Sequence, residues 1–376
     1  MRNKLLILTA SLMIVLGGLT SAYGQIRYGQ PASGRVGFVY SNWKVESKVD
    51  SNGTETTVNQ LSFPVVGFLP LQDNLEMRLF VAGASNSIDG DYGDVSFFGL
   101  GDMRLQINKS LSDDQWLISA GVNLPTGKKS LDSDGRQILS MLSKNYLSFP
   151  VRRMGTGFGF NLLLATARAS GTLKYGAGIM YQFNGTYEPY EGTDNYDPGD
   201  KVSINAGVDL VSGPTVFSAD VIYALYTADK FDGNKNFRQS PVLDLRLGLN
   251  RQAGSTILKF RTRYAKRGNN EIYSGDGQDV AQSLRLFGNE ILVAGNVSFL
   301  VGEGLRLIPL AELRLISENE DDFGNASIIG FGSNFEYQMA QDTKMTLGGK
   351  MYTGSADGGD LDLSGMQLSI GLAASF

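Results

Sequence analysis

Residues 173–183 read LKYGAGIMYQF, a stretch in which large apolar side chains alternate with polar or small ones. One face carries Leu173, Tyr175, Ala177, Ile179, Tyr181 and Phe183, and the other carries Lys174, Gly176, Gly178, Met180 and Gln182. Successive side chains of a β-strand point to opposite faces, so a period of two predicts a strand whose faces meet different surroundings.

The same alternation recurs along the chain, clearly in residues 116–124, 202–210, 243–250 and 366–376. Alternating segments of about ten residues are typical of membrane β-barrel strands, in which the apolar positions face lipid and the others face the interior. A soluble β-sandwich alternates as well, but we expect its loops to have similar lengths at both ends.

The connections between the alternating segments are short and long in turn. The short ones are residues 70–74, 112–115, 169–171, 212–214, 251–254, 301–304 and 340–342. The other set is longer apart from its first member and comprises residues 50–53, 84–95, 127–155, 184–200, 227–240, 266–281, 318–326 and 354–363. Short periplasmic turns alternating with long external loops predict an all-β fold, a transmembrane antiparallel up-and-down β-barrel. We count about 16 strands within residues 35–376, or 14 if the poorly alternating segment 35–45 and its partner are misread.

The N-terminal residues have the features of an export signal. Arg2 and Lys4 precede an uncharged apolar stretch, residues 5–19, and small residues then lead to Gly24. This pattern predicts a cleaved signal peptide over residues 1–24, followed by a short periplasmic segment, residues 25–34. The apolar stretch is short for a transmembrane helix, which needs about 20 residues.

The last residue, Phe376, closes the alternating segment 366–376. A terminal aromatic in this position resembles the signal that the barrel-assembly machinery of bacterial outer membranes reads. We therefore predict an outer-membrane location, with that machinery and outer-membrane lipid as partners.

The composition excludes several classes of function. The chain has no His and no Cys, so neither a Ser-His-Asp triad nor the usual zinc site can form, and we expect no catalytic residues, no metal and no cofactor. It has 33 basic and 38 acidic residues, a net charge of −5, which argues against nucleic acid as a partner.

Charges are expected on the face that points away from lipid, because Lys or Arg facing the bilayer midplane costs about 2–4 kcal/mol. The densest predicted set of lumen-lining charges is Asp244, Arg246, Lys259, Arg261, Arg263, Glu290, Arg306, Glu312 and Arg314. One interpretation is a basic wall that selects anionic solutes. The other is a ladder of mutually neutralising charges, which we favour because carboxylates are interspersed.

One stretch resembles a known family. Gly99, Gly101 and Asp102, followed by Leu124-Pro125-Thr126-Gly127 and by a glycine-rich opening of the next segment at 155–159, are similar to the phenol meta-pathway type of outer-membrane transporter, a distant FadL-like barrel. The resemblance covers about residues 97–183 and implies passage of small hydrophobic or aromatic compounds. The glycines let a strand bend or approach a neighbour closely, and Pro125 ends a strand.

The longest loop, residues 127–155, contains an apolar subset: Ile138, Leu139, Met141, Leu142, Tyr146, Leu147 and Phe149. These side chains predict either a constriction or gate folded into the barrel, or a short helix packed on the rim. The leading hypothesis is a channel for passive uptake or efflux of small molecules, with hydrophobic or aromatic compounds as candidates. The alternatives are a sealed surface-binding or structural barrel and a general porin with anion preference.

Overall fold

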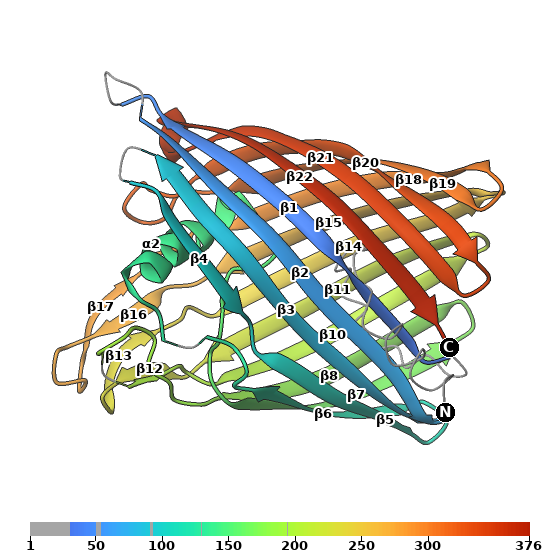
Figure 1. The fold of residues 1–376 in the computed structure, drawn as a ribbon. Helices are drawn as coiled ribbons and strands as arrows, with labels where there is room; N and C mark the ends of the chain where they lie inside the picture. Colours follow the sequence, from blue (N-terminus) through green and yellow to red (C-terminus); the bar gives the residue numbers. More distant parts are fainter. Residues whose placement is uncertain (1–30, 50–53, 91–92, 129, 194) are drawn as a thin grey trace, which may run out of the picture.

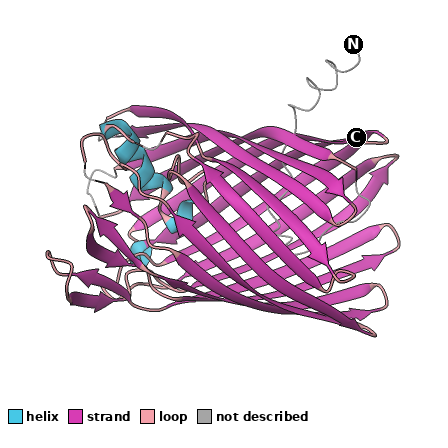
Figure 2. Ribbon diagram, turned by 90° about the horizontal axis from the view of Figure 1, so that it is seen from below, coloured by secondary structure: helices cyan, strands magenta, loops and turns pink. Residues whose placement is uncertain are grey.

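The computed structural model describes residues 31–49, 54–90, 93–128, 130–193 and 195–376. They form a closed antiparallel barrel (Figures 1 and 2). The wall strands are β1 (Ser33–Ser47), β2 (Glu55–Gln72), β3 (Leu75–Gly90), β4 (Val95–Leu100), β5 (Met103–Leu111), β6 (Trp116–Leu124), β7 (Gly159–Ser170), β8 (Leu173–Asn184), β10 (Lys201–Ser212), β11 (Thr215–Tyr226), β14 (Val242–Ala253), β15 (Thr256–Arg267), β18 (Glu290–Gly302), β19 (Leu305–Ile316), β20 (Ala326–Ala340), β21 (Thr343–Ala356) and β22 (Leu361–Ser375). The predicted signal peptide, residues 1–24, lies outside the described residues, as does most of the predicted segment 25–34.

The barrel closes because β1 pairs with both β2 and β22. β4 and β5 pair with successive parts of β3, so together they make one wall strand. Counted in this way the wall has 16 strands, which confirms the predicted architecture. None of the helices among the described residues is long and apolar enough to cross a membrane.

The junction of β4 and β5 is a β-bulge. Gly83 pairs with Leu100, and Phe80 pairs with Arg104 further along, so the register shifts by one residue between these two pairs. Gly101 and Asp102 lie opposite Ala82, and the Gly101 N–H donates to the Ala82 carbonyl at 2.7 Å. A bulge redirects side chains locally, and here it places Asp102 in the interior, where it is buried.

The outer surface of the wall is apolar. Its exposed side chains include Phe38, Leu61, Ile107, Ile118, Leu164, Ile179, Ile204, Phe217, Leu247, Phe260, Ile291, Phe331, Met351 and Ile370. They come from strands all around the barrel and alternate with the residues that face inward. A continuous apolar belt of this kind is the surface that lipid covers.

The two ends of the barrel differ. At the turn end, connections such as Gly171, Gly213 and Gly254 are tight and contain glycine at positive φ. At the loop end, β9 (Tyr196–Asp197), β12 (Ala228–Phe231), β13 (Asn234–Arg238), β16 (Asn270–Tyr273) and β17 (Val280–Leu284) form a separate five-stranded sheet. This sheet extends beyond the wall, as Figure 1 shows.

Two of the predicted long loops are shorter in the structure. The assignment of Ala84–Gly90 to a loop was wrong, because β3 continues to Gly90 and pairs with β2 and β4. Small and polar residues suggested a loop, but the interior side chains of this part of β3 are covered by other protein groups. Between β21 and β22 only residues 357–360 connect the strands.

The first strand is longer than the predicted segment 35–45, and its weak alternation has a physical cause. Trp43 faces inward and stacks on Tyr352, with the ring centroids 5.1 Å apart. On the outer face, Asn42 donates to Asn59 at 2.8 Å and Lys44 pairs with Glu55 at 2.7 Å. At the loop end the apolar and polar faces of β1 are therefore exchanged.

Candidate functional site in the barrel interior

The loop 127–155 folds into the loop end of the barrel. It contains α2 (Ser133–Leu142) and a 3₁₀ turn, η1 (Asn145–Leu147) (Figures 1 and 2). Most of the apolar subset is buried, namely Ile138, Leu142, Tyr146, Leu147 and Phe149, with Leu139 and Met141 packed against them. Their partners include Trp43, Val58, Phe97, Ile328 and Leu363, which belong to the inward faces of the wall strands. The loop is thus a plug against the inner wall and not a helix on the rim.

The plug covers about one side of the inner wall. The wall residues in its apolar cluster come from β1 to β4 and from β19 to β22. The inward faces of β6 to β18 contribute none of the buried residues in that cluster. The described interior is therefore divided into an apolar side under the plug and a polar, charged side opposite.

The start of α2 is fixed by its first turn. The Asp132 carboxylate accepts a hydrogen bond from the Gly135 N–H at 2.8 Å, as an N-cap does. That bond, together with Lys128 at 3.1 Å, holds the pKa of the Asp132 carboxyl below its usual range. Gly135 lets the helix start pack closely on Phe97, because a Cβ here would lie 3.0 Å from the Phe97 ring.

Asp102 holds the two ends of the plug. Its carboxylate accepts from the backbone N–H of Gly127 at 2.9 Å and of Thr156 at 2.6 Å. The side chains of Thr156 and Asn123 also donate to it, at 3.2 and 3.0 Å. Hydrogen bonds to a buried charged acceptor contribute about 1.5–3 kcal/mol each, so one carboxylate fixes where the chain enters and leaves the plug.

Glycines let the two ends of the plug cross closely. A Cβ on Gly127 would lie 2.6 Å from the Leu100 carbonyl oxygen and 2.8 Å from the Gly155 Cα. The Gly155 N–H donates to the Lys128 carbonyl at 2.8 Å. We call Gly101, Gly127 and Gly155 the neck of the plug.

The residues of the family resemblance meet at this neck. Gly99 faces Met154, where a Cβ would lie 2.8 Å from the sulfur. Leu124 ends β6, Pro125 starts the loop, and the Thr126 hydroxyl accepts from the Met103 N–H at 2.9 Å. The motif is therefore structural in this chain: it positions the plug.

Two polar side chains of the wall hold the far end of the plug. Gln60 of β2 exchanges two hydrogen bonds with the Val151 backbone, and its amide also donates to Asn86 at 2.8 Å. Arg314 of β19 donates to the Asn145 carbonyl at 3.3 Å and to the Ser148 hydroxyl. The sequence showed Arg314 as an inward charge but gave no sign of its partners in the plug.

The predicted charges form a connected ladder across β14, β15, β18 and β19. Arg246 and Arg263 bind Asp244 at 2.9 and 2.8 Å. Arg263 also binds Glu290 at 3.3 Å, and Glu290 lies 3.7 Å from Arg314. We call these five residues the charge ladder. It runs along the side of the interior that the plug leaves uncovered and reaches the plug at Arg314.

The remaining predicted charges differ in their pairing. Glu312 binds Lys350 at 3.3 Å, and outside the predicted set Glu336 binds Lys344 at 3.1 Å. Arg306 donates to the Ser255 carbonyl at 3.2 Å and to Ser298 at 3.4 Å. Over the described ranges, no ion pair joins Lys259, Arg261 or Arg306 to a carboxylate. The ladder interpretation thus fits the charges near the loop end. Nearer the middle and the turn end of the barrel, Lys259, Arg261 and Arg306 have no carboxylate partner among the described residues.

Arg152 is a residue of this site that the sequence analysis missed. It follows Val151 in the plug and is half-buried. Burial lowers the pKa of its guanidinium, Arg314 lowers it further, and Glu290 acts in the opposite direction. Only the apolar residues of the loop stood out in the sequence, because nothing in a loop's pattern indicates which polar side chain points toward the wall.

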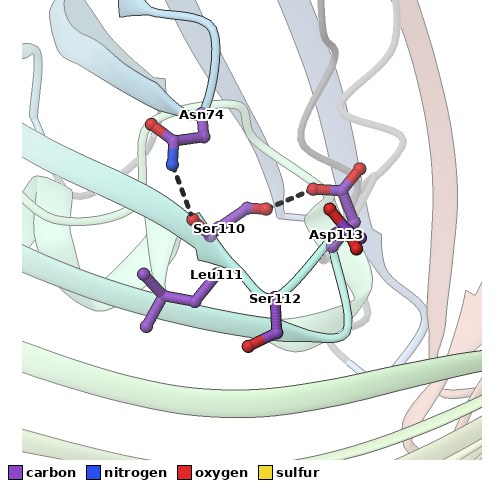
Figure 3. Close-up of a pocket in the computed structure, with 6 residues that line it drawn as sticks. Asn74, Ser110, Leu111, Ser112 and Asp113 are labelled. Carbon is purple, nitrogen blue, oxygen red and sulfur yellow. Dashed lines mark hydrogen bonds between the residues drawn. The ribbon is translucent and has the colours of Figure 1, made fainter.

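Two surface hollows lie outside this interior site. One, of about 490 Å³, is lined by Asn74 and by residues 110–114 at the turn end (Figure 3). There the Asn74 side chain donates to the Ser110 carbonyl at 3.2 Å, and Ser110 bonds Asp114. The other, of about 370 Å³, lies beside the start of α2, at Leu131, Arg136 and Glu191 among others.

No protein-family model matches the chain, and no curated protein matches it. Solved structures of similar shape include an outer-membrane channel from Pseudomonas putida F1, an anion-selective porin from Comamonas acidovorans and a FadL homologue from Pseudomonas aeruginosa. Their identities to this chain are 11%, 11% and 8%, and their TM-scores 0.39, 0.41 and 0.45. The aligned regions cover 96%, 92% and 93% of this chain and 100%, 100% and 91% of the others.

The chain's own geometry decides its location. A closed antiparallel barrel of 16 strands with short turns at one end, long loops at the other and an apolar outer belt has the architecture of bacterial outer-membrane proteins. This protein is an outer-membrane β-barrel.

Proposed function

We propose that this protein is a channel that lets small polar solutes cross the outer membrane by passive diffusion. The observation that carries the proposal is the environment of Arg261. This residue lies at mid-length of β15 and faces inward, yet its side chain is exposed to solvent. The middle of the barrel interior is therefore wide enough for water beside this side chain.

The size of the barrel supports the proposal. Barrels of 16 strands are wide enough to enclose an aqueous path unless a plug fills them. The plug packs on one side of the inner wall, and the opposite side keeps its charged side chains. The constriction would thus be the space between the plug and the charge ladder.

The chemistry of the interior favours polar solutes. The family resemblance implies hydrophobic or aromatic compounds, which would need an apolar path. The largest apolar side chains of the interior, such as Trp43, Ile138 and Leu142, are enclosed under the plug. The uncovered side presents Arg246, Arg263 and similar groups, which interact better with hydrated or charged solutes.

The test is single-channel recording in planar bilayers. The mature protein is expected to give steady openings. A variant with residues 130–153 replaced by a short Gly-Ser linker should conduct several times better, and the linker is feasible because Gly155 and Lys128 are already hydrogen-bonded. A silent wild type, from protein whose folding is verified by heat-modifiable gel mobility, would favour a sealed binding or structural barrel. Equal conductance of the two proteins would contradict the plug as the constriction.

A further inference from the structure

The charge ladder contains more arginines than carboxylates. Arg246, Arg263 and Arg314 share Asp244 and Glu290, so the five side chains carry a net charge of +1. Asp244 is buried and already accepts from two arginines, through both of its oxygens. The two carboxylates therefore leave part of the arginine charge unneutralised.

Arg152 adds a further positive charge from the plug side. It follows Val151, which bonds Gln60 of the wall, and lies four residues after Ser148, which accepts from Arg314 at the end of the ladder. The charges of Arg314 and Glu290 both act on its guanidinium. Within the parts of the chain that the structure describes, no ion pair is recorded for Arg152. An arginine keeps its charge under these conditions. Asp220 of β11 lies opposite Arg246 and adds a third carboxylate, so the constriction carries four arginines against three carboxylates.

The excess continues toward the turn end. Lys259 and Arg261 lie between Arg263 and the turn end on the inward face of β15, and both are exposed to the lumen. Their cross-strand neighbours are Asn250 and Asn296 for Lys259, and Gly248 and Ala294 for Arg261. None of these neighbours is acidic. The acidic groups further along, Glu312 and Glu336, are paired with Lys350 and Lys344, so a solute passing the constriction would meet Lys259 and Arg261 as basic groups without an ion-pair partner among the described residues.

We propose that the constriction is an anion-binding filter, formed by Arg152 of the plug with Arg263 and Arg314 of the wall, that selects small solutes bearing carboxylate or phosphate groups. This inference rests on the channel function proposed above. Guanidinium groups donate N–H bonds that match the oxygens of such groups. Arg152 would supply these donors, while Arg263 and Arg314, whose N–H groups already bond Asp244, Glu290 and the plug, contribute positive charge. In a narrow passage with low-dielectric walls, a net positive charge raises the local concentration of anions.

The experiment is the reversal potential of single channels in a potassium chloride gradient. Wild type should prefer chloride to potassium. Removing one charge in Arg152→Gln should lower the permeability ratio about threefold, and Arg152→Glu about tenfold, for charges a few ångströms from the ion path in a water-filled pore. Arg136→Gln is the matched control, because Arg136 lies in the same loop but stacks on Tyr190 beside the outer hollow. It should leave the ratio unchanged.

A second measurement tests binding itself. Millimolar inorganic phosphate should reduce the chloride current of wild type and of Arg136→Gln, and have a clearly smaller effect on Arg152→Gln. Steady channels without anion preference, or equal phosphate block in all three proteins, would overturn the filter and leave the channel function standing. Absence of conductance from folded wild type would overturn both proposals.

Discussion

The Gln60 side-chain amide and the Val151 backbone exchange two hydrogen bonds, of 2.7 and 2.9 Å, across 91 residues of sequence. Gln60 belongs to the wall and Val151 to the plug, and both are buried. The two bonds resemble those between paired residues of neighbouring β-strands, with the Gln60 side-chain amide in place of one backbone amide. It holds the plug next to the residue, Arg152, that faces the charge ladder.

Replacing Gln60 should loosen the plug without disrupting the barrel. In Gln60→Leu the buried N–H and C=O of Val151 lose their partners, which costs about 1–3 kcal/mol per group. We expect noisier single-channel currents with frequent brief closures, and earlier cleavage of the plug by added protease. Asn59→Ala is the control, since Asn59 is the neighbour on the outer face. If the two variants gave the same single-channel currents and the same rate of plug cleavage, the role given to Gln60 would be contradicted.

Asp102 should be more critical than Asn123 and Thr156, the other polar residues beside the neck. Asp102→Ala removes the acceptor of the Gly127 and Thr156 N–H groups, and we expect the plug to detach at both ends because charged acceptors contribute about 1.5–3 kcal/mol per bond. Limited proteolysis should then cut within residues 130–153, and conductance should rise toward that of the plug-deleted variant. Asp113→Asn, in a tight turn at the other end of the barrel, should leave both measurements at wild-type values.

The close crossing of the neck predicts an asymmetry between two glycines. Gly127→Ala brings a Cβ to 2.6 Å from a carbonyl oxygen, whereas Gly275→Ala meets nothing within 4 Å. Overpacking typically costs about 1–3 kcal/mol, so Gly127→Ala should lower the urea midpoint for unfolding in lipid vesicles while Gly275→Ala leaves it in place. If the Gly127→Ala variant unfolded at the wild-type urea midpoint, the plug ends would not cross as described.

The C-terminal residue offers a test of assembly. The Phe376 N–H donates to the Ala32 carbonyl at 2.7 Å, while the residue is 54% exposed. Phe376→Ala should therefore scarcely change the stability of folded protein but should lower the amount assembled in the outer membrane of living cells, if the barrel-assembly machinery reads this ring. Phe323→Ala, an exposed aromatic in an external loop, is the control. Equal membrane levels of the two variants would remove Phe376 from the assembly signal.

The alternation in segments such as 173–183 was sufficient to predict the barrel, its 16 strands and the inward direction of Arg246, Arg263 and Glu290. Strand geometry alone produces that result, because every second side chain must face lipid and a charge there is costly. The alternation gave wrong predictions at the loop end, where inward-facing side chains contact other protein groups instead of water. At the loop end Trp43 faces the plug instead of water, and Ala84–Gly90 is covered by neighbouring protein groups instead of forming a loop.

The position of the plug was decided by tertiary structure alone. Ile138, Leu142 and Phe149 were visible as apolar residues of a loop, and burial in the barrel or packing on its rim would satisfy them equally. The hydrophobic effect is not directional. It requires that these side chains leave water, but it does not specify the surface on which they pack. Directional bonds from distant residues, Asp102 at the neck and Gln60 and Arg314 at the far end, specify that surface. They also place Arg152 where the charges of Arg314 and Glu290 act on it. No local sequence pattern encodes that these segments come near each other.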